Sequence, residues 1–286
     1  MRSIKKIAVL VNRNKREYQK IIARLDVVLR GKAITRRIID RHITDTEEIS
    51  SVSRELASYD LLITIGGDGT LLNGLTLIVP HTIPVLPVYH GTLGFIAEID
   101  VEQSAAILAE MVAGKRTLYE IEKRHLIDVE LASGREVTHH TAVNEAVVAK
   151  GNYPKLGHFA VDINGKNLAY VKADGIIVAS PTGSTAYALS AGGPIINPRV
   201  NALILLPIAP HSLTFRPLVV CGDDTIAVSL AAESGDTALA IDGRPVSRFR
   251  QGDSVRVTVS QASFRLVKLR TRSFYEVLKE KLHWGK

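Results

Sequence analysis

One aspartate stands among glycines where an apolar run ends. The segment LLITIGGDGT, residues 61–70, has Asp68 as its only charged residue. Ligands of a parallel sheet bind at the carboxyl ends of its strands, and a helix N-terminus offers free N–H groups to an anion. Glycines let the backbone approach a phosphate closely, because they carry no Cβ. The pattern therefore predicts a phosphate loop of Gly66, Gly67, Gly69 and Thr70.

Asp68 needs a chemical reason to stand beside phosphates. A carboxylate there is repelled unless a metal ion neutralises it or unless it takes a proton from a reacting group. The alternative is structural, since an Asp-Gly pair makes a tight turn and an aspartate can cap a helix. This segment alone leaves both interpretations open.

The loop is not one of the familiar phosphate loops. A Walker A loop needs Gly-Lys-Ser or Gly-Lys-Thr, and the Gly-Lys pairs at 31–32, 114–115 and 165–166 are followed by Ala33, Arg116 and Asn167. The Rossmann fingerprint needs a third glycine where Leu72 stands, and the protein-kinase motifs are absent. Any phosphate bound here is therefore held by a loop of another type.

A second segment rich in hydroxyl groups and glycines runs from Asp174 to Pro198, DGIIVASPTGSTAYALSAGGPIINP. Its hydroxyl and backbone donors come with little bulk, which suits a loop that wraps a polar ligand. A connecting loop of turn residues is the alternative. The polar pair Asn144 and Glu145 interrupts the apolar strand pattern VNEAVV, where a satisfied structural network is again the alternative. The proline-bounded loop of residues 209–217 offers His211 and Arg216.

Histidines and cysteines do not form a metal-binding pattern. His139 and His140 are adjacent, so in a strand they point to opposite faces, and no His-x-x-x-His spacing occurs. Cys221 is the one cysteine, which excludes an internal disulfide and a cysteine-cluster site and fits a reducing compartment. We expect no dedicated transition-metal site and no metal-ligand set in the chain.

The first 120 residues are predicted to alternate strands and helices. Short apolar runs predict strands at 7–11, 61–65 and 83–88. Helical spacing follows each of them: one helix ends near Gly31, one ends at Pro80, and one begins at Asp100 and ends at Gly114. Asp100 is the expected N-cap, with Gln103 at the capping-box position. Repeated strand–helix alternation predicts a parallel sheet with helices on its faces.

Strands and tight turns dominate the rest of the chain. Asn164-Gly165 and Asp242-Gly243 are hairpin signals. Helical periodicity returns only in SFYEVLKEKL, where Phe274, Val277, Leu278 and Leu282 form one face. We therefore predict an α/β domain at 1–120, with 268–286 packing back on it, and a β-rich domain at 121–267. Clefts between domains favour ligand binding.

Composition narrows the class of protein. The 286 residues carry a formal net charge of +7, which fits nucleic acid, an anionic membrane or a phosphorylated substrate. No basic tract is studded with aromatic residues, so nucleic acid is not the expected partner. No apolar stretch reaches 18 residues, and the N-terminal apolar run is too short for a signal peptide. We expect a cytoplasmic protein without a membrane partner.

Several motifs, in order, resemble those of the NAD kinase family, which belongs to a superfamily with diacylglycerol-type lipid kinases and phosphofructokinases. They are GGDGT at 66–70, GTLGF at 91–95, NE at 144–145, the segment at 174–195, PHSL with RP at 210–217, and DG at 242–243. The resemblance implies an N-terminal α/β domain, a C-terminal β-rich domain that binds NAD, an active site between them, and a chain end that returns to the first domain.

The family's reaction transfers the terminal phosphoryl group of ATP, or of another donor such as polyphosphate, to the 2′-hydroxyl of the adenosine ribose of NAD. The product is NADP, and a divalent metal ion, expected to be Mg²⁺, takes part. The resemblance also suggests a homodimer or homotetramer. NAD and ATP are therefore the expected small-molecule partners.

The resemblance also assigns roles to residues. Asp68 would be the catalytic base, or would orient the hydroxyl or help to hold Mg²⁺; Gly67 and Gly69 would leave room for phosphates. Asn144 and Glu145 would contact the ribose region, and Asp174 the nicotinamide end. Asn73 stands where relatives often carry a basic residue, and Arg244 where a neutral amide is common. The full set of expected substrate-binding residues is Asp68, Gly69, Asn144, Glu145, Lys155, Lys172, Asp174, Thr185, Ala186, Tyr187, Ala188, Leu189, Ser190, Ala209 and Arg244.

Two other functions compete with the kinase. A lipid kinase would share the glycine loop but should present an amphipathic surface to a membrane, and no strongly amphipathic basic helix is evident. A non-catalytic dinucleotide sensor would keep the pocket without turnover. Asp68 argues against the sensor, because a pure binder of an anion gains nothing from a carboxylate at its phosphate loop.

Overall fold

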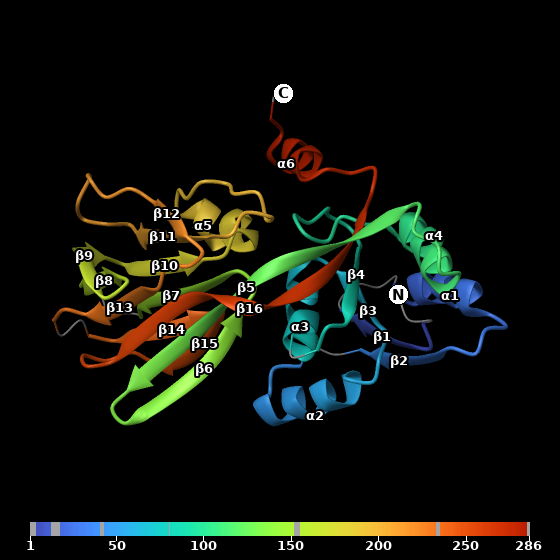
Figure 1. Ribbon diagram of the computed structural model, residues 1–286, viewed down its shortest axis with the longest axis horizontal. Helices are drawn as coiled ribbons and strands as arrows, with labels where there is room; N and C mark the ends of the chain where they lie inside the picture. Colours follow the sequence, from blue (N-terminus) through green and yellow to red (C-terminus); the bar gives the residue numbers. More distant parts are fainter. Residues whose placement is uncertain are drawn as a thin grey trace. The chain divides into compact units, whose positions relative to one another are not determined.

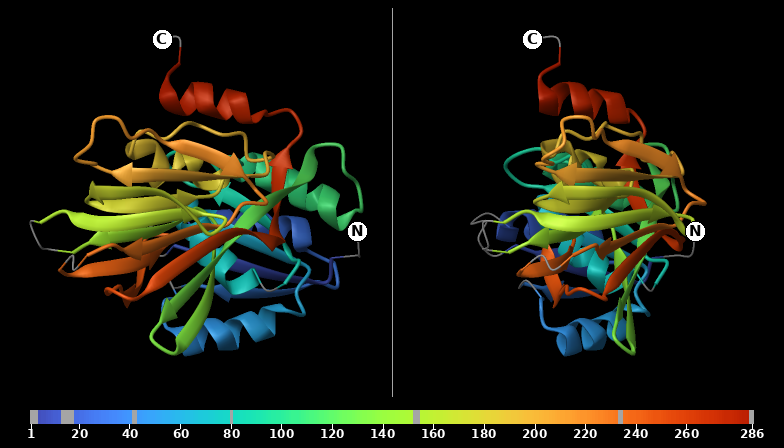
Figure 2. Two further views of the ribbon diagram at one scale, coloured as in Figure 1. Left: turned by 60° about the vertical axis from the view of Figure 1, so that its left-hand side comes forward. Right: turned by 90° about the vertical axis from the view of Figure 1, so that its left-hand side faces the viewer.

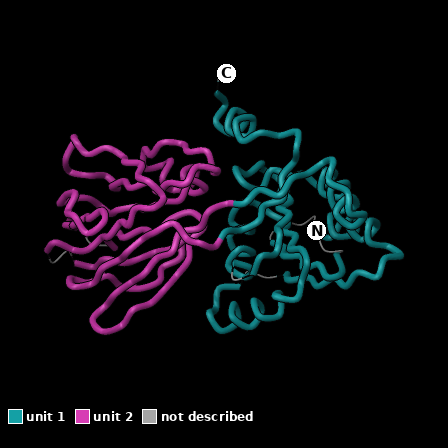
Figure 3. The backbone as a smooth tube through the Cα atoms, in the orientation of Figure 1, with its two compact units in different colours: residues 1–123, 263–286 teal, residues 124–262 magenta. Residues whose placement is uncertain are grey.

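The computed structural model describes residues 4–12, 18–40, 43–79, 81–151, 155–232 and 235–284. The chain forms two compact units, residues 1–123 with 263–286 (unit 1) and residues 124–262 (unit 2), drawn in separate colours in Figure 3. The sequence prediction set the corresponding boundaries at 120 and 268. Within the described ranges, no helix has the length and apolar character needed to cross a membrane.

Unit 1 is built on a parallel sheet. Its strand order is β2 (Thr35–Ile39), β1 (Lys6–Val11), β3 (Leu61–Gly66), β4 (Pro84–Tyr89) and the C-terminal part of β16 (Ser254–Leu269), and the printed registers of all four pairs are parallel. β3 is buried along its whole length, as expected for a strand that is covered on both faces. The predicted parallel α/β domain is confirmed.

Four helices cover this sheet (Figure 1). α1 (Tyr18–Leu29) packs against α4 (Val101–Val112) on one face, and α2 (Thr46–Leu56) packs against α3 (Asp68–Ile78) on the other. The α1 and α4 face shares one apolar core with alternate residues of β1 and β3. α4 begins with the predicted capping box of Asp100 and Gln103. Pro80, the expected end of the third helix, lies outside the described residues.

Two elements of unit 1 were not named from the sequence. β2 is an edge strand in which only Ile39 is buried, so it has no apolar run. α2 is N-capped by Asp45, whose carboxylate accepts the Glu48 N–H at 2.9 Å. Its buried face is limited to Val52, Ser53 and Leu56. These three positions are too few to give a clear helical pattern of apolar residues in a mostly polar sequence.

Unit 2 contains two antiparallel sheets. One has the order β16, β13 (Ile226–Leu230), β8 (Gly157–Ile163), β9 (Lys166–Ala173); on the other side of β16, β5 (Tyr119–Ser133) pairs with it and with β6 (Glu136–Ala142). The second has the order β12 (Leu218–Cys221), β11 (Ala202–Ile208), β10 (Gly175–Ala179), β7 (Glu145–Lys150), β14 (Thr237–Ile241), β15 (Arg244–Arg248). The main apolar core draws residues from both sheets, so the predicted β-rich domain is confirmed.

The other face of the second sheet is covered by the hydroxyl-rich segment. This segment forms the short 3₁₀ helix η1 (Thr182–Thr185) and the short helix α5 (Tyr187–Ser190). Ala188 and Ile196 pack with β7, β10 and β11 in a separate apolar cluster. Figure 2 shows this segment along β10 and β11. The segment is therefore a layer of the fold as well as a loop.

The predicted tight turns are present. Asn164 and Gly165 have φ of 53° and 75°, and Asp242 and Gly243 have φ of 48° and 74°. Two successive residues with positive φ suit the two-residue turn of a hairpin.

The final helix, α6 (Phe274–Leu282), belongs to unit 1. Ser273 and Glu276 form a capping box at its start, and Val277 and Leu278 are buried on the face that the sequence predicted. The predicted return of the chain end to the first domain is confirmed.

Candidate functional site

Asp68 is the first residue of α3 and lies just after β3 in unit 1. Gly67 is the N-cap, so the interpretation of Asp68 as a helix cap is wrong. The Asp68 carboxylate instead accepts three backbone hydrogen bonds from a loop 27–29 residues away: Phe95 N–H to Oδ2 at 2.9 Å, and Ile96 and Ala97 N–H to Oδ1 at 3.2 and 2.9 Å. We call this arrangement the Asp68 site.

Glycines determine how closely the chain approaches Asp68. A Cβ on Gly94 would overlap the Asp68 carboxylate, so the second glycine of GTLGF is required by packing. A Cβ on Gly66 would overlap the side chain of Thr70. Gly67 and Gly69, in contrast, face open space. Of the predicted phosphate loop, Gly67 and Gly69 therefore leave room for a ligand, and Gly66 and Thr70 pack against each other.

In unit 2, Asp242 organises the backbone around Asn144 and Glu145. Its carboxylate accepts the N–H groups of Val143, Asn144 and Glu145 at 2.8, 2.7 and 3.2 Å, and its own N–H donates to the Glu145 carbonyl at 3.0 Å. The Asp242-Gly243 turn is thereby fixed to the start of β7. The sequence marked Asp242 as a turn residue and missed this second role.

Three buried polar atoms near this turn have no hydrogen-bond partner among the described residues: Asn144 Oδ1, Glu145 Oε2 and Thr182 Oγ1. Asn144 is 7% exposed and Glu145 5% exposed. Buried polar atoms are nearly always paired, and the alternative of a satisfied structural network does not describe these side chains. A polar ligand would supply the missing hydrogen-bond partners of these three groups.

Glu145 is also electrostatically unusual. Burial, and then the neighbouring charge of Asp242, raise the pKa of Glu145 to about 8; the Tyr187 N–H opposes this shift. Burial also raises the pKa of Asp242, against its three backbone hydrogen bonds and the charge of Arg244. A pKa of about 8 means that Glu145 holds a proton at neutral pH.

Some hydroxyl groups of the hydroxyl-rich segment are used in hydrogen bonds within the protein, and other residues of the segment are those predicted to bind a ligand. Ser180 Oγ donates to the Val143 carbonyl at 2.6 Å, and Ser184 Oγ donates to the Pro181 carbonyl at 2.7 Å. The Ser180 hydroxyl therefore joins the segment to the residues before β7, whereas the Ser184 hydroxyl joins two parts of the segment to each other. The predicted binding residues follow them: Ala188 is buried, Thr185, Ala186 and Leu189 are half-buried, and Tyr187 and Ser190 are exposed.

The other expected contact residues lie on and between the strands of unit 2. Asp174, at the end of β9, pairs with Lys150 at 2.6 Å, a partner that the sequence did not suggest. Ala209 is exposed at a φ of 43°, which is rare for a residue with a side chain and is often found at functional sites. Lys155 and Lys172 are exposed, and Arg244 begins β15 beside Asp242.

Asn73 has a structural role. It is 1% exposed on α3, and its side-chain amide bonds both backbone groups of Ile43: Nδ2 donates to the carbonyl at 2.7 Å, and Oδ1 accepts the N–H at 3.3 Å. The buried amide of Asn73 is therefore satisfied within unit 1.

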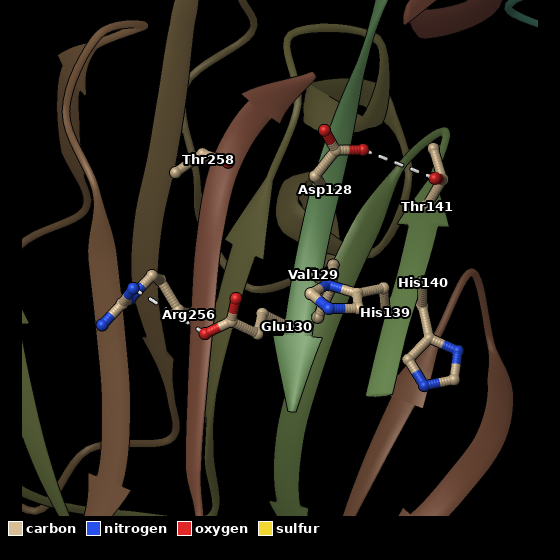
Figure 4. Close-up of a pocket in the computed structure, with 8 residues that line it drawn as sticks. All are labelled: Asp128, Val129, Glu130, His139, His140, Thr141, Arg256 and Thr258. Carbon is tan, nitrogen blue, oxygen red and sulfur yellow. Dashed lines mark hydrogen bonds and ion pairs between the residues drawn. The ribbon is translucent and has the colours of Figure 1, made fainter. Parts of the chain in front are cut away.

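His139 and His140 lie on β6, where register places them opposite Glu130 and Val129 respectively, on opposite faces of the strand. A hollow of about 350 Å³ is lined there by Asp128, Val129, Glu130, His139, His140, Thr141, Arg256 and Thr258 (Figure 4). Arg256 pairs with Glu130, and Thr141 bonds Asp128. Over the described ranges, no three His, Cys, Asp or Glu side chains are grouped to hold a metal ion.

Comparison with known proteins gives family matches over most of the chain. Residues 7–116 match the family model described as the ATP-NAD kinase N-terminal domain, and residues 143–269 match the ATP-NAD kinase C-terminal domain. An NAD kinase from Heliobacterium modesticaldum is 40% identical over 232 residues, 81% of each chain. An NAD kinase from Acidobacterium capsulatum is 35% identical over 286 residues, 99% of each chain.

Two solved structures share the fold. Yeast NADH kinase, crystallised with NADH, has a TM-score of 0.88 and 24% identity, covering 100% of this chain and 89% of that chain. An NAD kinase from Archaeoglobus fulgidus in complex with ATP has a TM-score of 0.74 and 24% identity, covering 95% of this chain and 98% of that chain.

Proposed function

The chain belongs to the NAD kinase family, and we propose that it transfers the terminal phosphoryl group of ATP to the 2′-hydroxyl of the adenosine ribose of NAD. The hydroxyl oxygen forms the new bond to phosphorus, the bond from the γ-phosphorus to its bridging oxygen breaks, and ADP leaves. The hydroxyl proton passes to a carboxylate. The products are NADP and ADP.

The observation that carries this proposal is the way the Asp68 carboxylate is held. An ionised carboxylate has about four lone-pair sites, and three of them accept the N–H groups of Phe95, Ile96 and Ala97. Oδ2 accepts only one of these bonds, so it keeps a lone pair for a ligand. Asp68 would use this lone pair to orient the ribose hydroxyl and to receive its proton.

Positioning and charge neutralisation are the main contributions that a protein makes to phosphoryl transfer. We propose that the open space at Gly67 and Gly69 admits the phosphates of ATP at the start of α3, where helix N–H groups favour an anion. Mg²⁺ is commonly held by one or two carboxylates together with substrate phosphates. Binding of Mg²⁺ by the same Asp68 lone pair is the alternative to its role at the hydroxyl, and a bound Mg²⁺ would neutralise charge on the phosphates.

NAD would bind through the residues of unit 2. The unpartnered atoms of Asn144, Glu145 and Thr182 support hydrogen bonds to ribose hydroxyls, and a protonated Glu145 would donate one. Residues Thr185 to Ser190 would hold the adenine and its ribose, and Asp174 the nicotinamide end. Lys155, Lys172, Ala209 and Arg244 would complete the contacts.

ATP as donor is supported by the family models and by the ATP-bound relative, and NAD as acceptor by the relatives' names. We further propose that the protein acts in the cytoplasm, as its single cysteine suggests, and that it assembles as a homodimer or homotetramer. Light scattering during size-exclusion chromatography tests the assembly, and a monomer at micromolar concentration would contradict it.

The activity test uses the purified full chain with ATP, Mg²⁺ and NAD. An NADP-specific dehydrogenase reports the product, because it accepts only the 2′-phosphorylated dinucleotide. We expect NADP to accumulate in proportion to enzyme. Binding of NAD by calorimetry without any NADP would identify a sensor instead, and phosphorylation of diacylglycerol in lipid vesicles without NADP would identify a lipid kinase.

A further inference from the structure

The final helix contacts the loop that holds Asp68. Lys281, in the last turn of α6, donates from Nζ to the Leu93 carbonyl at 2.8 Å. Its ammonium group also lies over the ring of Phe95, 5.2 Å from the ring centroid. Both contacts lie within unit 1. One cation therefore binds the loop at Leu93 and at Phe95, the first of the three residues whose N–H groups bond Asp68.

The other end of this loop is held by a second cation from the same returning segment. Arg272 donates from Nη1 to the Glu98 carbonyl at 3.2 Å. Inside the loop, the Gly94 N–H donates to the Ala97 carbonyl at 3.0 Å. The residues that donate to Asp68 therefore lie between two contacts, at Leu93 and at Glu98, that residues 263–286 make with this loop.

We infer that Lys281 is a positioning residue for phosphoryl transfer, acting through the Leu93–Phe95 backbone to fix the orientation of the Asp68 carboxylate. The inference rests on the proposed role of Asp68. Its physical basis is geometric: Asp68 takes its orientation from three N–H groups, and a misplacement of about 1 Å can cost about 100-fold in rate. Groups outside an active site commonly supply such support.

Docking of α6 does not depend on Lys281. Val277 and Leu278 are 1% and 2% exposed and supply the apolar contact that holds the helix, while Ser273 and Glu276 cap its start. Removing the ammonium group should therefore leave the fold in place and release the loop. Lys279, which is exposed two residues earlier in the same last turn of the helix, has no described side-chain contact with the loop and is a matched control.

The test compares Lys281→Met, Lys281→Arg and Lys279→Met in the full chain. Methionine keeps an aliphatic side chain but removes the charge and the donor. We expect kcat of Lys281→Met to fall about 10- to 100-fold, with KM for NAD and the Tm nearly unchanged. Arginine, which can donate to Leu93 and stack on Phe95, should restore most of the activity, and Lys279→Met should match the wild type.

Hydrogen exchange supplies a readout that does not need activity. The amides of Phe95, Ile96 and Ala97 should exchange faster in Lys281→Met, while those of α4 stay protected. Unchanged kcat and unchanged exchange would overturn the inference. A fall in kcat that merely follows a lower fraction of folded protein, or a rise in KM for NAD alone, would also overturn it. A wild type that makes no NADP would refute the proposed function instead, and the exchange result would still decide whether Lys281 holds the loop.

Discussion

At the scale of single residues, two carboxylates with similar partners are placed to do different things. Asp68 and Asp60 both accept backbone N–H groups in unit 1: three for Asp68, and those of Lys5 and Lys6, at 2.8 and 2.9 Å, for Asp60. Asp60 precedes β3 and Asp68 follows it, so they lie at opposite ends of the same strand. Only the carboxyl end of a parallel strand is the usual place for a ligand.

Asp68→Asn should therefore lose activity without losing the fold. Asparagine can still accept from Ile96 and Ala97 but cannot take a proton, and removal of a general base costs about 10²- to 10⁴-fold in rate. We expect kcat to fall by that factor with the Tm nearly unchanged. Asp60→Asn is the matched control and should keep kcat. Near-normal turnover by Asp68→Asn would assign Asp68 a purely structural role.

Glu145→Gln should change how stability depends on pH. Burial, and then the charge of Asp242, raise the pKa of Glu145 from 4.5 to about 8, so the folded protein keeps a proton that the unfolded chain has lost. This contribution to stability is fully present below pH 4.5 and is lost as the pH rises towards 8. Glutamine carries no such proton. The free energy of unfolding of Glu145→Gln, relative to wild type, should therefore rise between pH 5 and 8.

Denaturant titrations at several pH values and fixed ionic strength measure this difference. Glu136→Gln, a change at an exposed position of β6, is the control and should follow the wild-type profile. If Glu145→Gln also runs parallel to the wild type, Glu145 is ionised in the folded protein and cannot donate a hydrogen bond to the ribose.

At the scale of elements, local signals were predictable and distant ones were not. The α4 capping box and the Asn164-Gly165 turn depend on residues only a few positions apart in the chain, so local sequence patterns predict them. β2 is an edge strand with one buried residue, so its composition gives no strand signal. Asp68 was identified as a site residue, but its partners are backbone N–H groups 27–29 residues away, and no side-chain pattern could have indicated them.

Asn73 makes a contact between two segments of unit 1, and its loss should be measurable as a fall in stability. It joins α3 to the chain before α2 by bonding both backbone groups of Ile43. Asn73→Ala leaves those buried groups without partners, which costs about 1–3 kcal/mol for an unsatisfied group. We expect chemical denaturation to show a loss of that size, with kcat unchanged in the folded fraction. Lost activity at wild-type stability would instead assign Asn73 to the substrate site.

At the scale of the whole molecule, the proposed functions are divided between two units. Asp68, its supporting loop and Lys281 belong to unit 1, and the residues proposed to bind NAD, Asp68 and Gly69 apart, belong to unit 2. The chain crosses between the units in β5 and β16, and residues 263–286 return to unit 1. Catalysis and NAD binding can therefore be changed by separate substitutions. The stabilisation of the folded protein by NAD measures binding without measuring catalysis.

NAD at 100 times its Kd should stabilise the folded protein by about 2.7 kcal/mol, because it binds the native state alone. We expect Asp68→Asn to keep this stabilisation, since Asp68 would act on the hydroxyl after NAD is bound. Asn144→Ala removes a buried amide whose Oδ1 has no partner among the described residues, so at the same NAD concentration its stabilisation should be clearly smaller. Asn167→Ala, at an exposed hairpin position of unit 2, should respond as the wild type does. Equal stabilisation of Asn144→Ala and the wild type would remove Asn144 from the NAD site, and loss of stabilisation in Asp68→Asn would mean that the carboxylate contributes to binding as well as to the reaction.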